Sequence, residues 1–385
     1  MESAIFLQSD VNNPYEIYSQ MLSSSPVFWD DKNKLWAIYS YTGCRRVLTE
    51  SAAQIPPLNN NGLNEYALLI AGKLVRLNNP PQHKAARQVT MQLFEKMKQV
   101  SLPDILENLI QSANGVNEID WINTVCKKLP VLAILRGFDF PDTDIEFVEN
   151  NILRLTKIMS PNKTTEQIDA INQIAEEIYK IAEKNITLSN FLKNIADVDT
   201  LTSDADKEDI LALCISNLIG LLIQSYDAGR GLLSNSLMQV LLHTDSAEIN
   251  LSDNNYFTRS VLETLRFDPP VHNTRRILAD DIFINEQQLK KRETILVVLA
   301  AANRDPAQFN EPDKYNIERH NNSQHLTFGT GHHMCIAKYF SMNMASETLS
   351  WLFRKYKKIE MPRQKIEYEP IVNARLPKEL FISLS

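Results

Sequence analysis

The segment HLTFGTGHHMCIAKYF, residues 325–340, holds the residues of this chain that are best suited to carry chemistry. Cys335 can act as a thiolate, which donates electrons strongly to a metal such as haem iron, and metal binding itself deprotonates the thiol. Gly329 and Gly331 permit a tight bend that brings backbone N–H groups toward the sulfur, and Phe328 can shield the sulfur from water. A helix that begins just after Cys335 would aim its positive end at the thiolate.

The same residues allow two simpler interpretations. His332, His333 and Cys335 could form a small metal site, or Cys335 could be a buried cysteine beside a surface pair of histidines. The chain has four cysteines in all, and their wide spacing without a CxxC pair disfavours a disulfide framework or a structural zinc site. Sparse, unpaired cysteines are typical of a reducing cytoplasm. The four are Cys44, Cys126, Cys214 and Cys335.

This segment resembles the cysteine-ligand loop of the cytochrome P450 family, whose pattern is F-G-x-G-x-H-x-C-x-G. The last glycine of the pattern is replaced by Ala337, which is still small enough for close packing on a porphyrin. The resemblance implies that Cys335 is the axial ligand of the iron in haem b, iron protoporphyrin IX. The matching positions are Phe328, Gly329, Gly331, His333 and Cys335.

A second match is the sequence ETLRFDPP, residues 263–270. Glu263 and Arg266 are three residues apart and can pair on one helix face. The proline pair that follows ends the helix. In the family this ExxR pair is buried and joined by a downstream arginine, and Arg319 stands where that third residue belongs.

A third match is NPPQHKAAR, residues 79–87, which resembles the family's D-P-P-x-H-x-x-x-R. His83 and Arg87 share a helix face. The two haem propionates are natural partners for charge-assisted bonds from such side chains. The resemblance assigns this task to His83, Arg87, Arg276 and His325.

A long helix is expected to pass over the haem, beginning near Ser203-Asp204 and reaching about His243. Its segment 210–223 is apolar on nearly all sides but shorter than a membrane span, so we expect a buried core helix and no membrane insertion.

The centre of this helix departs from the family pattern A-G-x-[DE]-T. Asp227 keeps the acid, but Ala228 replaces the threonine whose hydroxyl usually orders water for proton delivery. Ser225 or Gln224 could take over this catalytic task, or the substrate could. Our preferred hypothesis is a monooxygenase whose substrate, or Ser225 and Gln224, assists the proton relay.

Three other functions stay open. A peroxide-using enzyme would need no such relay, and Arg230 could then hold a substrate carboxylate or simply pair with Asp227 or face solvent. A coupling or desaturating enzyme would insert no oxygen. A non-catalytic haem sensor would have no turnover at all.

The resemblance also predicts which residues surround the substrate. The loop 51–77 is expected to be mobile and the helices within 147–184 to form a lid. Gln224 suggests a substrate with hydrogen-bonding groups. The expected pocket residues are Gly220, Gln224, Ala228, His272, Asn273 and Ala374.

The elements that must position these residues are mostly helical. Residues 80–269 indicate successive helices, residues 13–23 another, and PVFWD with LWAIYS a hairpin. IFINEQQL, TILVVLAAA and the terminal ELFISLS indicate strands. We therefore predict a mainly α fold with a minor β part (α+β). The resemblance implies the triangular-prism-like P450 fold as one haem-binding domain over 1–385.

The composition of the chain limits the kinds of binding partner that we expect. The net charge of −7 over 385 residues disfavours a nucleic-acid binder. The N-terminus shows no signal-peptide pattern, so we expect a cytoplasmic monomer without a membrane anchor. Since no GxGxxG motif for flavin or nicotinamide occurs, the resemblance implies a separate electron donor of the ferredoxin or flavodoxin type. The substrate is expected to be a small secondary metabolite, either free or tethered to a carrier protein.

Overall fold

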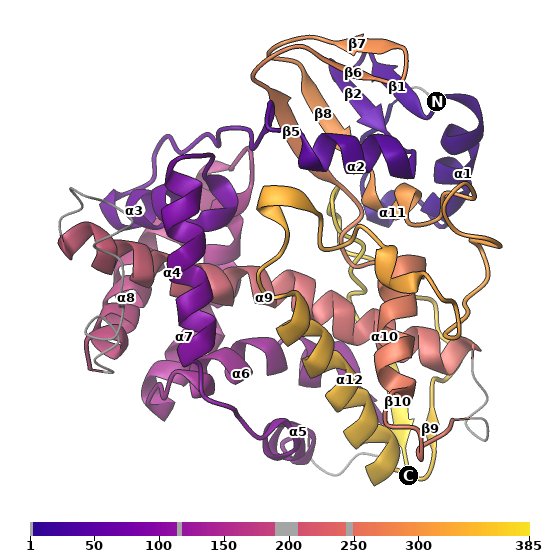
Figure 1. Cartoon of the computed structure of the whole chain (residues 1–385). Coiled ribbons are helices and arrows are strands. Elements are labelled where there is room, and N and C mark those ends of the chain that lie inside the picture. Colours follow the sequence, from indigo (N-terminus) through magenta and orange to yellow (C-terminus); the bar gives the residue numbers. More distant parts are fainter. Residues whose placement is uncertain (1–2, 114–117, 189–206, 244–248) are drawn as a thin grey trace. The chain divides into compact units, whose positions relative to one another are not determined.

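A computed structural model describes residues 3–113, 118–188, 207–243 and 249–385 (Figure 1). They group into two compact units that share the chain in alternating stretches. The first unit comprises Met1–Pro56, Leu102–Lys127 and Ala228–Ser385, and the second comprises Pro57–Ser101 and Lys128–Asp227. The expectation of a single domain stays a prediction.

All strands of the described residues lie in the first unit. The largest sheet has the order β1-β2-β8-β5-β3, and its first two strands form the hairpin predicted from PVFWD and LWAIYS. The strands of this sheet are β1 (Val27–Asp30), β2 (Leu35–Ile38), β3 (Ala53–Gln54), β5 (Thr274–Leu278) and β8 (Thr294–Val297). A three-stranded sheet joins β4 (Glu118–Asp120), β10 (Phe381–Leu384) and β9 (Ile359–Glu360), and β6 (Ile282–Ile284) pairs with β7 (Gln287–Leu289).

The run TILVVL contains strand β8, and both faces of this strand are buried. A strand without a solvent-facing side favours apolar residues at consecutive positions, which accounts for the run. Ile295 and Val297 belong to one core cluster, whereas Leu296 and Val298 belong to another. This alternation follows from the two-residue period of a strand. The prediction of a strand through Ala302 was wrong at its end, since Leu299–Ala302 forms the short helix α11. Alanine is the residue with the strongest helix propensity, which favours this switch.

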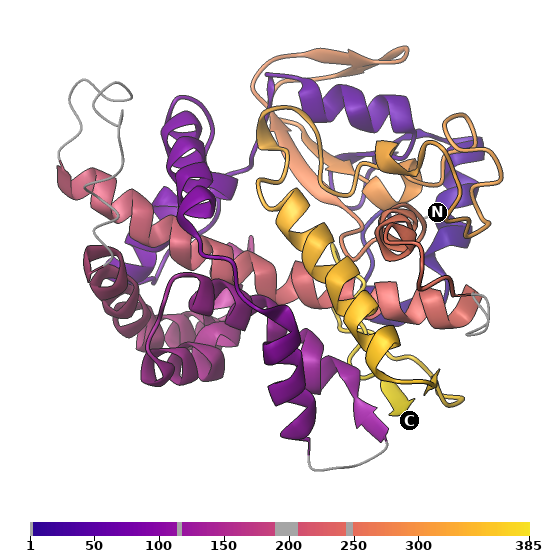
Figure 2. The ribbon, with the colours of Figure 1, turned by 60° about the horizontal axis from the view of Figure 1, so that its bottom comes forward.

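The helices of the first unit pack around these sheets, and α12 lies against both α10 and α5 (Figures 1 and 2). Asn13 caps the N-terminus of the first α-helix, and α10 ends at Phe267, ahead of the proline pair. The helices of this unit are η1 (Gln8–Asp10), α1 (Pro14–Ser24), α2 (Tyr41–Thr49), α5 (Leu102–Gln111), η3 (Ile122–Cys126), α10 (Tyr256–Phe267), α11 (Leu299–Ala302), η8 (Asn322–Gln324), η9 (Gly331–His333) and α12 (Lys338–Lys355).

Among the described residues of the second unit, helices are the only regular secondary structure, as expected from residue 80 onward. Its elements are α3 (Glu65–Lys73), η2 (Val75–Leu77), α4 (Gln82–Lys96), α6 (Leu129–Gly137), α7 (Asp142–Thr156), η4 (Lys157–Met159) and α8 (Thr165–Leu188).

The long helix α9 (Lys207–His243) gives its first part to the second unit and its last part to the first. Its 37 residues span about 56 Å at 1.5 Å per residue. The predicted start at Ser203-Asp204 lies outside the described residues, and the predicted end at His243 is confirmed. The helix is long and apolar enough to cross a membrane, yet 67% of its most apolar window is buried inside the structure. Burial by protein accounts for its composition, as predicted.

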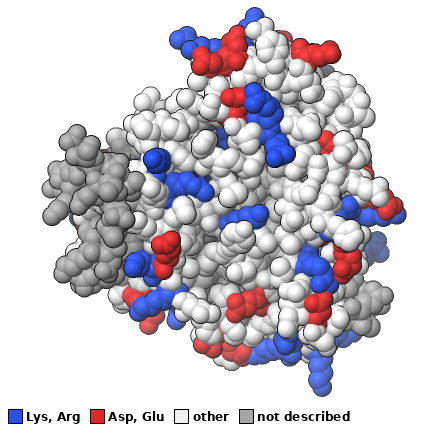
Figure 3. Space-filling model, in the orientation of Figure 1, with Lys and Arg blue, Asp and Glu red and all other residues white. Residues whose placement is uncertain are grey.

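Charges are mixed on the face shown in Figure 3, where Lys and Arg side chains lie scattered among Asp and Glu. The whole sequence has a net charge of −7 at pH 7. Among the described residues on this face, cations do not gather into the broad basic surface that is typical of nucleic-acid binding.

Candidate functional site

The loop that carries Cys335 is held in a defined bend. Cys335 N donates to Phe328 O at 2.9 Å, which closes the loop. Gly329 and Gly331 have φ angles of +67° and +72°, which favour glycine. A Cβ atom on Gly331 would lie 2.7 Å from the carbonyl oxygen of Leu48, so α2 leaves no room for a side chain there.

Among the four cysteines, only Cys335 is not buried. Burial raises the pKa of the Cys44 and Cys126 thiols strongly and that of Cys214 to about 12. These three therefore remain protonated and inert at neutral pH. Helix α12 begins at Lys338, three residues after Cys335, so its positive N-terminal end lies next to the sulfur in the chain.

The interpretation of a small metal site at His332, His333 and Cys335 finds no support. Within the described part of the chain, no group of three or more His, Cys, Asp or Glu side chains could hold a metal ion. A cofactor that brings its own iron and needs a single protein ligand agrees better with this loop.

His325 is a buried donor that lacks an acceptor. Thr327 N donates to its Nδ1 at 3.2 Å, so Nε2 must carry the proton. None of the described residues accepts from this buried Nε2. Burial, with smaller contributions from Lys338 and Arg266, lowers the pKa of His325 to about 3, so the ring is neutral. A carboxylate such as a haem propionate would satisfy the orphaned N–H, and the site therefore fits the cofactor.

Arg276, the other propionate candidate of the first unit, lies on β5 and is only 4% exposed. Its Nη1 donates to Thr274 Oγ1 at 3.2 Å and to Arg275 O at 2.8 Å. These bonds fix the guanidinium against the sheet. An arginine held in this way can bind a carboxylate with little further loss of side-chain entropy.

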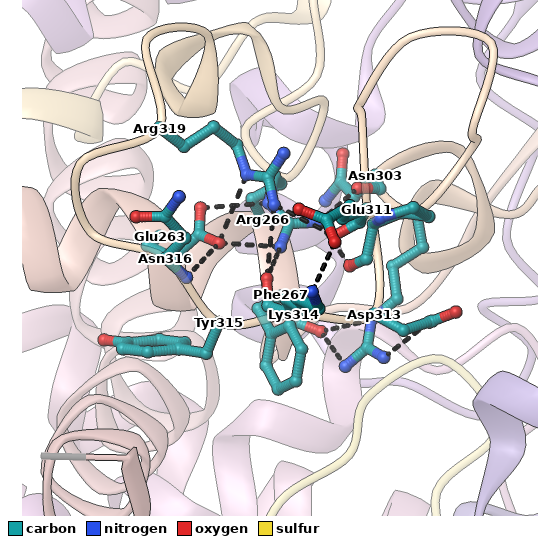
Figure 4. A network of polar contacts seen from close by, with 12 residues as sticks. Glu263, Arg266, Phe267, Asn303, Glu311, Asp313, Lys314, Tyr315, Asn316 and Arg319 are labelled. Carbon is teal, nitrogen blue, oxygen red and sulfur yellow. Dashed lines mark hydrogen bonds and ion pairs between the residues drawn. The ribbon is translucent and has the colours of Figure 1, made fainter.

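Glu263, Arg266 and Arg319 form one buried network (Figure 4). Arg266 binds both carboxylate oxygens of Glu263, at 2.9 and 2.7 Å, and neither side chain is exposed. Arg319 Nε lies 3.4 Å from Glu263 Oε1. Arg266 also donates to the backbone oxygens of Asn303, Pro312 and Lys314, so its donors are satisfied. The structure thus brings together the three residues that the ExxR pattern singled out.

Asn303 is a positioning residue that sequence reasoning missed. Its side chain is fully buried and donates to Leu265 O and to Thr327 Oγ1, while Leu326 N donates to Asn303 Oδ1 at 2.6 Å. Asn303 therefore ties α10 to the start of the cysteine segment. No pattern marks this residue, because its partners are 24 and 38 positions away in the chain.

His83 and Arg87 lie one turn apart on α4 in the second unit. His83 is buried and Arg87 is half-buried. His83 N donates to Asn79 O at 3.1 Å at the start of this helix. The two side chains therefore share a face of α4, as the spacing predicted.

Helix α9 has one accessible window in its middle. From Cys214 to Val240, every residue is buried except Gln224, Ser225, Asp227 and Ala228. Ala228 is the exposed member of this set. The four residues that we named as catalytic candidates are therefore the ones on this stretch that keep some exposure, and their catalytic role stays a prediction.

Ser225 uses its hydroxyl hydrogen, and Gln224 one of its two N–H groups, in bonds to their own helix. Gln224 Nε2 donates to Gly220 O at 3.0 Å, and Ser225 Oγ donates to Leu222 O at 2.9 Å. Such bonds satisfy donors locally within a helix.

Arg230 does not face solvent, contrary to one of our expectations. It is only 4% exposed, and its Nη1 forms an ion pair with Glu369 Oε1 at 3.2 Å. Glu369 is 139 residues away in the chain, so spacing alone could not have predicted this ion pair. This pairing weakens the idea that Arg230 holds a substrate carboxylate.

Three of the expected pocket residues are buried in the structure. A Cβ on Gly220 would lie 2.6 Å from Leu74 Cδ2, so this glycine accommodates a neighbouring side chain. His272 is fully buried, with its Nδ1 3.0 Å from Tyr18 Oη. Ala374 is buried and forms a β-bridge with Val271. Neighbouring segments pack over all three positions, and their role in the pocket stays a prediction.

Asn273, also expected in the pocket, is likewise only 6% exposed. Its Nδ2 donates to the backbone oxygen of Val372 at 3.0 Å. The bond ties the segment after the proline pair to the C-terminal turn and leaves the side chain little access to a ligand.

We expect His272 to make stability depend on pH. Burial, then the charges of Arg375 and Arg304, lowers its pKa well below the ordinary value. As the pH falls, the unfolded chain binds the proton before the folded chain does. The stability that neutral His272 contributes is therefore fully present above about pH 6.5. It is lost as the pH falls below that value, by up to about 1.4 kcal/mol per pH unit. Urea unfolding between neutral and mildly acid pH measures this slope, which His272→Leu should flatten. The exposed His320→Leu serves as the control, and an equal slope in all three proteins would refute the assignment.

The loop expected over the pocket, residues 51–77, is only partly a loop, because it contains β3, α3 and η2. Its segment before α3 is bound to α8, one of the expected lid helices. Asn172 Oδ1 accepts from Asn64 N at 2.8 Å, Asn172 O accepts from Asn64 Nδ2, and Asn172 Nδ2 donates to Gly62 O. One asparagine thus joins the two segments within the second unit.

Replacing Asn172 with alanine should loosen this connection. The side chain accounts for two of the three bonds, so residues 57–66 should exchange their amide hydrogens faster, by about tenfold if opening becomes 1.4 kcal/mol easier. Hydrogen exchange read by mass spectrometry tests this. Asn151→Ala is the matched control, since Asn151 donates only to Phe147 O of its own helix. Unchanged exchange in Asn172→Ala would contradict the prediction.

The amino-acid sequence is similar to those of known proteins. The family model for cytochrome P450 matches residues 235–381. The chain is 23% identical over 380 residues to the putative cytochrome P450 YjiB of Bacillus subtilis (strain 168), covering 95% of this chain and 92% of that protein. It is 24% identical over 394 residues to pulcherriminic acid synthase of the same organism, covering 97% and 95%.

The structure is also similar to solved ones. P450BioI, in complex with acyl carrier protein ligated to hexadec-9Z-enoic acid, matches with a TM-score of 0.81. The sequence identity is 20%, and the match covers 97% of this chain and 99% of that chain. This likeness confirms the predicted fold, which is mainly helical with a minor sheet part.

Proposed function

The chain belongs to the cytochrome P450 family and is an oxidoreductase of the monooxygenase type, and on this premise we propose that its substrate supports the delivery of protons to dioxygen. The observation that carries the proposal is the accessible window of α9. There Ala228 has no hydroxyl, the Ser225 hydroxyl donates to Leu222 O, and one of the two N–H groups of Gln224 donates to Gly220 O. A hydroxyl or carboxyl of the substrate would replace the missing threonine.

Each unit contributes residues that we expect to bind the haem. Cys335 would bind the iron, His325 and Arg276 would bind propionates from the first unit, and His83 with Arg87 would do so from the second. When bound through a thiolate, haem activates dioxygen and supplies the oxidising chemistry. The protein residues keep Cys335 in a bend closed by backbone bonds and supply a neutral donor at His325 Nε2.

The substrate would be a small organic molecule of secondary metabolism. Pulcherriminic acid synthase, a relative by sequence, bears the name of one such product. P450BioI was solved with a ligand attached to acyl carrier protein, so a carrier-tethered substrate is an alternative to a free one. Electrons would come from a separate ferredoxin- or flavodoxin-type protein in the cytoplasm, with exposed His332 and half-buried Lys338 beside Cys335 as candidate contacts.

Ala228→Thr tests the proton-delivery proposal. If the substrate replaces the threonine, the added hydroxyl should change the ratio of hydrogen peroxide released to reductant consumed, because two proton sources then compete. Turnover with and without substrate, with peroxide assayed alongside, measures this ratio. Unchanged peroxide release and turnover would overturn the proposal.

Two further measurements separate the remaining functions. Titration of the haem Soret band with free small molecules, and with the same groups loaded on a carrier protein, distinguishes a self-contained pocket from carrier docking. Labelled dioxygen reports whether oxygen enters the product. Unlabelled product would indicate coupling or desaturation, and turnover driven equally well by peroxide would indicate a peroxide-using enzyme.

A further inference from the structure

The turn that precedes α3 in the second unit contains an Asn-Gly pair. Asn61 and Gly62 are both exposed. Leu63 N donates to Asn60 O at 3.2 Å, and Gly62 has a φ angle of +84°, so residues 60–63 match a type II turn with Asn61 and Gly62 at its centre. Within the described part of the chain, no residue forms a hydrogen bond with the Asn61 side chain or with Gly62 N. Neither group is therefore occupied by a bond of its own.

This pair of residues allows a reaction between the backbone and a side chain. The deprotonated Gly62 nitrogen can form a bond to Asn61 Cγ, while the bond from Cγ to Nδ2 breaks and the side-chain nitrogen leaves as ammonia. Water then opens the five-membered imide at one carbonyl to give aspartate, or at the other to give isoaspartate. Glycine favours the attack because it has no Cβ that would obstruct the approach. Asparagine is one of the thermolabile residues of proteins.

The folded turn opposes this reaction. In a type II turn the ψ angle of the second residue is about +120°, which directs Gly62 N away from the side of Asn61 that carries Cβ. Ring closure therefore requires the turn to open. Asn172 on α8 resists opening, because its Nδ2 donates to Gly62 O at 2.8 Å and its Oδ1 accepts from Asn64 N at 2.8 Å. Gly62 also lies close to α8, since a Cβ atom on it would be 3.3 Å from Ile168 Cγ2.

Lys163 restrains the chain on the other side of the pair. It lies two residues before α8, and its Nζ donates to Asn59 O at 3.0 Å and to Ser160 O at 3.0 Å. The exposed pair therefore lies between two attachments to the same region. Only the attachment through Asn172 holds the reacting residue Gly62 itself, so its release should control the reaction.

We propose that Asn61 is a site of deamidation and that the bond from Asn172 to Gly62 determines its rate. The product weakens the same connection, because isoaspartate adds a methylene group to the main chain ahead of Gly62 and moves Gly62 O relative to Asn172. Deamidation should therefore release the segment before α3 from α8. The inference does not depend on the proposed function, since neither haem nor substrate takes part.

The test follows the intact, haem-loaded protein over days at physiological temperature and mildly alkaline pH, which favours the deprotonated amide. Mass spectrometry of its peptides measures the conversion of amide to acid at residue 61, and chromatography separates aspartate from isoaspartate. Wild type should accumulate both products. Asn172→Ala should do so about tenfold faster, the factor expected for its amide hydrogen exchange, because both processes need the same opening.

Asn172→Asp isolates the bond to Gly62 and guards against a general loss of structure in the alanine variant. Its carboxylate can still accept from Asn64 N but cannot donate to Gly62 O, so it should also accelerate the reaction about tenfold. Asn151→Ala should leave the rate unchanged. Asn114 and Gly115, which lie outside the described residues, are the other Asn-Gly pair of the sequence, and their rate in each sample serves as a reference that Asn172 should not affect.

Two results would contradict the inference. If Asn61 stays intact in wild type and variants over a time in which it is converted in urea-unfolded protein, Asn61 is not a deamidation site of the folded protein. If Asn61 reacts no faster in the two Asn172 variants than in wild type, the bond to Gly62 does not determine the rate.

Discussion

Cys335→Ser is expected to abolish the thiolate signature of the haem and reduce monooxygenase turnover by at least about a hundredfold. A serine oxygen is a weaker electron donor to iron than a thiolate, and a loss of only about 2.7 kcal/mol of transition-state stabilisation slows turnover about a hundredfold. The loop should persist, because the bond from residue 335 N to Phe328 O belongs to the backbone. The Soret position of the reduced, carbon monoxide-bound protein reports the ligand directly, alongside turnover.

Cys214→Ala is the matched control for this experiment. Burial keeps Cys214 protonated on α9, so its replacement should leave the thiolate signature intact. A thiolate-type Soret band that survives in Cys335→Ser would show that another residue binds the iron, and the assignment of Cys335 would then be wrong.

Glu263→Gln is expected to destabilise the protein by about 3–5 kcal/mol, since it leaves the Arg266 charge buried without its partner. Neither side chain is exposed, so water cannot compensate. Arg319 and the backbone N–H of Asn316 lose the same carboxylate. Because Asn303 joins this network to the cysteine segment, haem should also be retained less well.

Urea unfolding, followed by circular dichroism and by haem absorbance, measures both effects. Glu318→Gln makes the same chemical change at an exposed pair with Arg259, where a loss of no more than about 1 kcal/mol is expected. Equal midpoints for the two variants would mean that the buried network contributes no more than a surface ion pair.

Several features could be predicted from the sequence alone, because they depend on local physical rules. The positive φ angles of Gly329 and Gly331, the hairpin of β1 and β2, the end of α10 before two prolines and the burial of α9 all follow from a few neighbouring residues. Steric limits on φ and ψ, strand alternation and helix periodicity act over less than about 20 residues. The spacing of the ExxR pair likewise placed Glu263 beside Arg266.

Other features depended on contacts between distant parts of the chain. The pairing of Arg230 with Glu369, the position of His272 beside Tyr18 and the role of Asn303 each join residues that no spacing relates. In the folded chain, four of the expected pocket residues are buried, whereas Gln224 and Ala228 remain accessible. The buried ones are Gly220, His272, Asn273 and Ala374. The sequence by itself determined the type of cofactor chemistry to expect, because a few adjacent residues make a ligand loop. Only the tertiary structure decided which side chains stay exposed, since exposure depends on how distant segments fill space around each residue.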